Sequence, residues 1–150
     1  MAKRFHFPLE TLLRVREVRE REAKRKVGHK QAEIARLDQL NQRTAEEISL
    51  RQNALRELQH GLLTPDDVTR ERAWIGYLRR TIVQRQAQRA GLVKELTALR
   101  EAWRQARTQK RIIAKLRERR WEEYVRDRKR REQAESDELA QQLHGYRIAN

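Results

Sequence analysis

The sequence predicts an all-α protein: a long antiparallel two-helix coiled-coil hairpin with helices of unequal length. Charged residues make up 39% of the 150 residues and apolar residues 37%, which leaves too few apolar side chains for an ordinary globular interior. Glycine and proline are rare, at 5 and 2 residues. A seven-residue apolar repeat runs on both sides of one short turn signal, as in coiled coils.

The first helix is expected from about residue 8 to about residue 60. Pro8 suits the first turn of a helix, where its missing N–H group is not needed. When Leu13 is placed at position a, the a positions are Leu13, Glu20, Val27, Ile34, Asn41, Ile48, Leu55 and Leu62. Composition alone leaves disorder open as an alternative, and this sustained repeat favours the helix.

The turn is expected over residues 61–64. Gly61 can end the first helix, and Thr64 is a good N-cap for the second. Pro65 and the two aspartates that follow it are typical of a helix N-terminus. Because the connection is so short, the two helices should lie side by side and antiparallel.

The second helix is expected from about residue 65 to about residue 143, followed by a frayed C-terminus. Its a positions are Val68, Ile75, Ile82, Arg89, Leu96, Trp103 and Lys110. Residues whose numbers sum to 126 should face each other, so that Leu13 meets Ile113 and Asn41 forms a polar layer with Arg85. The other expected layers are Ile48 with Leu78, Ile34 with Leu92, Val27 with Leu99, Leu58 with Val68, and Ala23 with Trp103. Residues 1–150 are therefore interpreted as a single coiled-coil domain.

The formal net charge is +14, and the basic residues are concentrated in two blocks. Residues 1–30 contain ten basic and four acidic residues, and residues 100–131 contain fourteen and five. In a hairpin these two blocks meet at the end away from the turn. This distribution indicates an acidic partner, for which nucleic acid is one candidate.

The sequence carries no pattern typical of an enzyme or a metal site. It has no cysteine, and its four histidines are too far apart to form a metal-binding pair. We expect no catalytic, cofactor-binding or metal-binding residues. No apolar run approaches the roughly 18–20 residues of a membrane span, and the N-terminus lacks the pattern of a secretory signal. The protein is expected to stay in the cytoplasm, without inserting into a membrane.

Two aromatic pairs stand three residues apart, as on one face of a helix. They are Trp74 with Tyr77, and Trp121 with Tyr124. Each pair could fill the seam between the helices or form an exposed anchor for a partner. The second pair is the stronger anchor candidate, because the second helix should extend past the first at that point.

Two stretches of the sequence carry short motifs. The N-terminal stretch is Phe5-His6-Phe7-Pro8-Leu9-Glu10-Thr11-Leu12-Leu13. The C-terminal stretch is Glu118-Arg119-Arg120-Trp121, followed by Tyr124 and a basic run. Both stretches resemble the flagellar FliJ family, and the length, the two-helix plan and the basic charge are also similar to this family. The stalk proteins of injectisomes form a sister family, in which the N-terminal pattern is less clear.

The resemblance implies a non-enzymatic stalk of the flagellar type III export apparatus, monomeric when free. It implies three partners: the export ATPase hexamer, the cytoplasmic domain of the export gate, and export chaperones. Through them the protein would lie at the cytoplasmic face of the inner membrane. The candidate ATPase-binding residues are Arg117, Arg119, Arg120, Trp121 and Tyr124, and the candidate gate-binding residues are Trp74 and Tyr77. The alternative is a basic coiled-coil nucleic-acid-binding protein, although no nucleic-acid motif is present.

Overall fold

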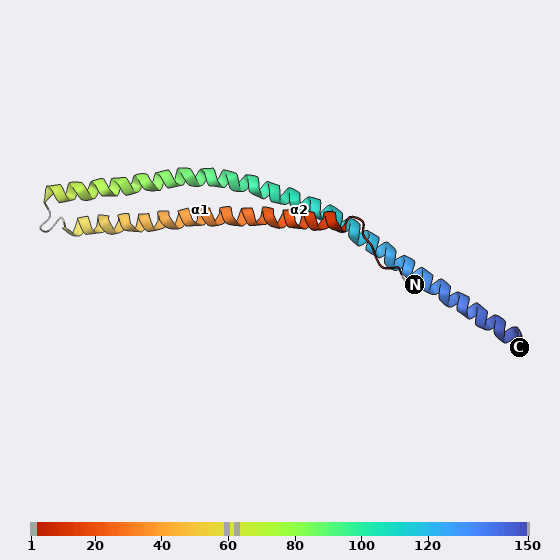
Figure 1. The fold of residues 1–150 in the computed structure, drawn as a ribbon. Helices are drawn as coiled ribbons and strands as arrows, with labels where there is room; N and C mark the ends of the chain where they lie inside the picture. Colours follow the sequence, from red (N-terminus) through yellow and green to blue (C-terminus); the bar gives the residue numbers. More distant parts are fainter. Residues whose placement is uncertain (1–2, 59–60, 62–63, 150) are drawn as a thin grey trace. The chain divides into compact units, whose positions relative to one another are not determined.

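The chain folds as a helical hairpin of two unequal helices that pack against each other, which confirms the predicted fold class. A computed structural model describes residues 3–58, 61 and 64–149 (Figure 1). Helix α1 comprises Glu10–Leu58 and has 49 residues. Helix α2 comprises Pro65–Ala149 and has 85 residues. The expected layer of Leu58 with Val68, and most of the expected turn, lie outside the described side chains.

The helix ends follow local sequence signals. The backbone turns at Pro8 and Leu9, where the Glu10 N–H donates to the Phe7 carbonyl oxygen over 3.1 Å, so α1 begins at Glu10 rather than at residue 8. At α2 the Asp67 N–H donates to the Thr64 hydroxyl oxygen over 3.3 Å, which confirms the predicted N-cap. Helix α2 then continues to Ala149, past the end near residue 143 expected from the sequence.

The chain divides into two compact units, which are described separately. Unit 1 comprises Met1–Glu20 with Gln105–Asn150, and unit 2 comprises Arg21–Arg104. Among the described residues of unit 2, two hydrophobic clusters lie along the two helices. One consists of buried Val27, Ile34 and Leu96 with partly buried Leu92, Leu99 and Trp103. The other consists of buried Ile48, Ile75 and Leu78 with partly buried Leu55 and Ile82. The expected layer partners Ile34 and Leu92, Val27 and Leu99, and Ile48 and Leu78 thus share their clusters.

Ion pairs join the two helices of unit 2 beside these clusters. They are Lys30 with Glu95 at 2.8 Å, Asp38 with Arg89 at 2.7 Å, and Arg51 with Glu71 at 2.9 Å. Hydrogen bonds to Glu95 and then Glu33 raise the pKa of Lys30 above its ordinary value. All these side chains are partly exposed, so each pair contributes little free energy. These ion pairs instead help to fix which residues of the two helices face each other.

A polar layer separates the two clusters of unit 2, close to where the sequence places one. The Arg85 guanidinium donates to the Thr44 hydroxyl oxygen over 2.8 Å and to the Leu40 carbonyl oxygen over 3.4 Å. Asn41, the partner expected from the sequence, does not receive this contact. Its side-chain oxygen is buried and has no hydrogen-bond partner among the described residues. The long Arg85 side chain reaches the neighbouring turns of α1 instead.

The variant Asn41→Ile is expected to stabilise unit 2. The substitution removes a buried unsatisfied acceptor and places a β-branched apolar residue at an a position, which should raise the free energy of unfolding by about 1 kcal/mol. Urea denaturation followed by circular dichroism measures this change. Gln42→Ile, at the exposed neighbouring position, should have an effect close to zero. A lower stability of Asn41→Ile would show that the amide makes a net favourable contact.

The core of unit 1 is one small cluster. It consists of buried Phe7, Leu13 and Ile113, with partly buried Phe5, Leu12, Ala114 and Leu116. Leu13 and Ile113 are one of the predicted layers, whereas the phenylalanines come from the segment before α1. We call residues 3–9 the N-terminal arm. The arm runs beside α2 beyond the start of α1 (Figure 1), and Phe7, only 4% exposed, anchors it.

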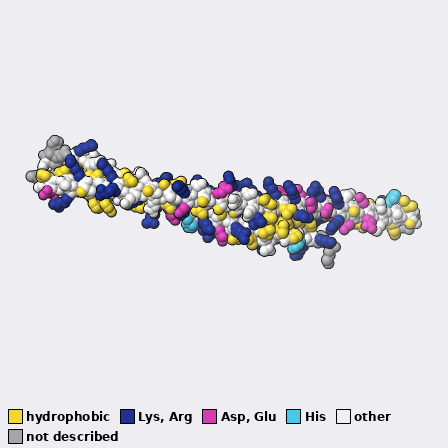
Figure 2. All heavy atoms as spheres, turned by 90° about the horizontal axis from the view of Figure 1, so that it is seen from above, with side chains coloured by type: hydrophobic (Ala, Val, Ile, Leu, Met, Phe, Trp, Pro, Cys, Tyr) yellow, Lys and Arg dark blue, Asp and Glu magenta, His cyan; other side chains and the backbone are white. Residues whose placement is uncertain are grey.

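Beyond the arm, α2 continues as a helix whose described residues are all exposed, from Arg126 to Ala149. The character of its surface changes along this stretch. Figure 2 shows basic side chains giving way to acidic and then hydrophobic ones toward the end of α2. Within residues 3–58, 61 and 64–149 no helix has the length and apolarity that crossing a membrane requires. In those same residues no cluster of three or more potential metal ligands occurs.

Candidate functional site

An aromatic cluster joins the N-terminal arm to α2 in unit 1. The Phe5 ring meets Trp121 edge-on, with the ring centroids 5.1 Å apart and an interplanar angle of 84°. The centroid of Tyr124 lies 5.6 Å from that of Phe5 and 5.5 Å from that of Trp121. The Tyr124 hydroxyl also donates to the Lys3 carbonyl oxygen. These contacts bring together two residues that the sequence assigned to ATPase binding.

Arg117 also contacts this aromatic cluster. Its guanidinium donates to the Glu10 carboxylate over 2.9 Å and lies 5.5 Å from the centroid of the Phe5 ring. An arginine that pairs with a carboxylate and stacks on a ring gains from both contacts. Arg117 therefore ties the start of α1 and the N-terminal arm to α2. This intramolecular role was not anticipated from the sequence.

The other two predicted ATPase-binding residues, Arg119 and Arg120, are exposed. Neither has an ion pair with another residue in the described part of the chain. Arg120 borders a groove of about 510 Å³ between the N-terminal arm and α2. The groove contains charges of both signs, including Lys3 and Arg4 on one side and Glu123 on the other. Of the five predicted residues, three therefore pack on the N-terminal arm: Arg117, Trp121 and Tyr124. Arg119 and Arg120 remain accessible.

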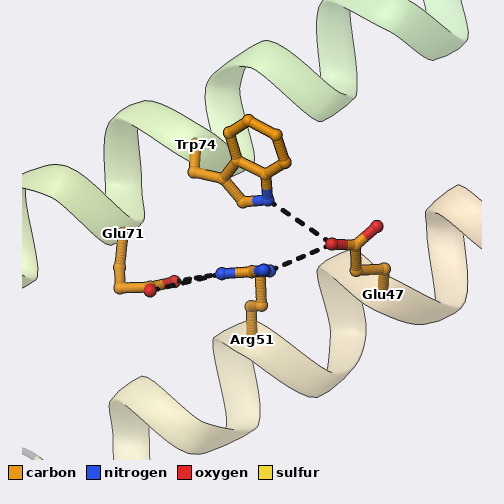
Figure 3. A network of polar contacts seen from close by, with 4 residues as sticks. All are labelled: Glu47, Arg51, Glu71 and Trp74. Carbon is orange, nitrogen blue, oxygen red and sulfur yellow. Dashed lines mark hydrogen bonds and ion pairs between the residues drawn. The ribbon is translucent and has the colours of Figure 1, made fainter.

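Trp74 and Tyr77, the predicted gate-binding pair, are both exposed in unit 2. Their rings stack with centroids 5.2 Å apart, and they remain 42% and 52% exposed. Figure 3 shows that Trp74 also contacts α1, where its indole N–H donates to Glu47 over 3.4 Å. The Arg51 guanidinium lies 5.5 Å from the Trp74 ring. The pair is therefore held in one orientation on the surface and does not fill the seam.

Arg51 is the centre of the network in Figure 3. It donates to Glu47 over 3.2 Å and to Glu71 over 2.9 Å. The hydrogen bond to Glu71 is the main reason that the pKa of Arg51 is raised. The network links α1 to α2 directly beneath the Trp74 ring. Trp74 thus presents a preorganised aromatic face, which lowers the entropic cost of binding a partner.

An exposed apolar stripe near the end of α2 was not predicted from the sequence. Leu139, Leu143 and Tyr146 stand at intervals of four and three residues and are 59%, 64% and 70% exposed. This spacing places them on one face of a helix, as in helices that bind in a hydrophobic groove. The spacing is visible in the sequence, where only Tyr146 falls in the C-terminal part expected to fray after residue 143.

The fold and these surfaces define a helical-hairpin protein with exposed aromatic and basic groups suited to contacts with other proteins. The sequence model of one family, described as flagellar FliJ protein, matches residues 5–147. The chain belongs to the FliJ family, as its two resembling stretches suggested. Members are non-enzymatic, cytoplasmic components of the flagellar export apparatus. No curated protein and no solved structure matches this chain.

Proposed function

We propose that this protein is a coiled-coil stalk of the flagellar export apparatus that binds the export ATPase hexamer, the cytoplasmic domain of the export gate and export chaperones. These contacts hold it at the cytoplasmic face of the inner membrane. Membership of the FliJ family supports the export role. The exposed surfaces of the two units support a function in binding, since each carries groups that fold stability does not require.

The ATPase-binding surface is proposed on unit 1, over residues 117–131 of α2. This stretch has eight basic and four acidic residues. The observation that carries the proposal is that Arg119 and Arg120 are exposed and have no ion pair with other residues that the structure describes. Accessible arginines attract an acidic surface and accelerate association with it. The partly exposed Trp121 lies beside them and adds apolar contact area. Arg117 supports this surface indirectly, because it ties the N-terminal arm to α2.

The gate-binding surface is proposed on unit 2, at Trp74 and Tyr77. Exposed aromatic residues are enriched among the residues that contribute most to binding. Here the Arg51 network fixes their orientation before any partner arrives. Aromatic contacts depend less on salt than the arginine contacts of unit 1, because they do not rely on opposite charges. The two surfaces can therefore be distinguished by measuring how the affinity for each partner changes with salt concentration.

The double variant Arg119→Glu, Arg120→Glu is expected to bind the purified export ATPase more weakly. The concentration needed for half-maximal stimulation of ATP hydrolysis should rise at least about tenfold, which corresponds to about 1.4 kcal/mol. Arg117 is left unchanged, because its reversal would release the N-terminal arm and confuse the result. The matched control reverses Arg36 and Arg43, two exposed arginines of α1 in unit 2 that lie in neither proposed surface. Equal stimulation by the folded test variant and by the wild type would refute this surface.

A further inference from the structure

A second groove lies in unit 2, between α1 and α2 near the turn. It has a volume of about 440 Å³. Its floor is formed by Leu55, Ile75 and Gly76, of which Ile75 is only 5% exposed. Its other lining residues are Gln52, Arg56, Arg72 and Arg79. The groove therefore combines an apolar floor with three arginines, and no carboxylate is among its described lining residues.

The three arginines are exposed, and none has an ion pair or hydrogen bond with another residue in the described ranges. This sets them apart from Lys30, Arg51 and Arg89 of the same unit, each of which is paired with a carboxylate. Arg72 and Arg79 stand seven residues apart on one face of α2, with Arg56 facing them from α1. Unpaired charges of one sign around an apolar floor repel one another and do not help the hairpin to fold.

Gly76 is the second feature that folding does not explain. Glycine inside a helix lowers helix stability relative to alanine, and Gly76 has no positive φ angle that would require it. A Cβ atom at this position would meet only the flexible end of Arg80, at 3.9 Å. The absent side chain keeps the floor of the groove open. Both features of this groove therefore favour an external partner.

This surface is distinct from the proposed gate-binding pair. Residues of an α-helix advance by about 100° each, so that Arg72, Gly76 and Arg79 fall within about 60° of one another. By the same rule, Trp74 and Tyr77 lie on the opposite side of α2. A partner in the groove and a partner on the aromatic pair would approach unit 2 from different sides.

We propose that this groove binds an acidic amphipathic helix of a partner protein. Apolar side chains of that helix lie on Leu55, Ile75 and Gly76, and flanking Asp or Glu side chains pair with the three arginines. The missing side chain of Gly76 allows the partner helix to approach closely. The apolar floor favours a protein over nucleic acid, because a phosphate backbone offers nothing to cover it. Bidentate pairing of arginine with carboxylates makes the contact depend on the orientation of the partner helix.

The test uses the full chain and a fluorescein-labelled 18-residue helical peptide with Leu on one face and Glu at the flanking positions. A second peptide has Gln in place of every Glu. Fluorescence anisotropy at low salt should show binding of the Glu peptide at least tenfold tighter than that of the Gln peptide. Arg72→Gln with Arg79→Gln should weaken binding at least tenfold. The control is Arg100→Gln with Arg107→Gln, two exposed α2 positions that are also seven residues apart. It should change binding of the Glu peptide less than twofold.

Gly76→Gln tests the location of the site independently of charge. A flexible side chain there covers the floor while favouring the helix, so binding should fall at least fivefold with no loss of thermal stability. Gly91→Gln, at an exposed position where a Cβ would meet nothing within 4 Å, is the matched control and should bind normally. The proposal is overturned if the Glu peptide does not bind at 1 mM, if both peptides bind equally, or if the groove variants bind like their controls. It is also overturned if single-stranded DNA binds the groove and the Glu peptide does not displace it.

Discussion

Replacing Phe7 with alanine is expected to release the N-terminal arm from α2. Phe7 is the most deeply buried side chain of unit 1, at 4% exposure, and packs with Leu13 and Ile113. Truncating a buried phenylalanine typically costs about 3 kcal/mol or more, which is a large share of the stability of so small a cluster. Amide hydrogen exchange should therefore become roughly a hundredfold faster over residues 7–13, since 1.4 kcal/mol corresponds to a factor of ten.

The controls for this result lie in the same cluster and in unit 2. Phe7→Leu keeps an apolar side chain of similar size and should slow or speed exchange only slightly. The amides of Val27–Ile34 in α1 should exchange at the wild-type rate in both variants, because they belong to another cluster. If exchange over residues 7–13 is unchanged in Phe7→Ala, the arm does not depend on Phe7, and the aromatic cluster around Phe5 must hold it alone.

The double variant Trp74→Ala, Tyr77→Ala is expected to lose most of its affinity for the cytoplasmic domain of the export gate. One aromatic residue at the centre of an interface commonly contributes about 2 kcal/mol or more, which corresponds to about thirtyfold in affinity. The dissociation constant of the double variant should therefore rise at least about thirtyfold. Both side chains are about half exposed, and the nearby Ile75 and Leu78 remain to hold the fold. Calorimetric titration of the gate domain with each variant measures the change.

A variant that removes apolar surface elsewhere on α2 supplies the comparison for this titration. Val83 is 63% exposed and Val93 is 37% exposed, and both lie in unit 2 outside its buried clusters. Val83→Ala with Val93→Ala should leave gate affinity within about twofold of the wild type. Affinity for the ATPase should be the same in both double variants. A Trp74→Ala, Tyr77→Ala protein that binds the gate as tightly as the wild type would remove this assignment.

The hairpin could be predicted because two independent local signals agree. The capping sequence at Thr64 marks the turn, and the heptad repeats place Leu13 with Ile113 and Ile48 with Leu78 in the same clusters. The partner of Arg85 could not be predicted from the repeat, since a long side chain can reach the turn before or after its own layer. Periodicity therefore determines which helix faces pack, whereas rotamers determine which polar atoms meet.

The surroundings of the candidate sites were harder to predict. The N-terminal arm has no helical period, so nothing in the repeat indicated that Phe5 would cover Trp121 and Tyr124. Those two aromatics were the stronger candidates for an exposed anchor, because α2 should extend past the start of α1. Arg117 was interpreted as a binding residue because it lies in a basic run, although it pairs with Glu10, more than 100 positions away in the sequence. Contacts of this range depend on the folded geometry and not on local spacing.

The most direct test of the proposed stalk function is hydrogen exchange of the full chain with and without the purified export ATPase hexamer. Residues 117–131 of α2 are exposed or half-buried when the protein is free, so their amides should open readily. Docking of the proposed ATPase-binding surface predicts slower exchange there, and unchanged exchange over residues 70–82 around Trp74 and Tyr77. Slower exchange only around Trp74 and Tyr77, or no change anywhere at low salt, would contradict the proposal that unit 1 binds the ATPase.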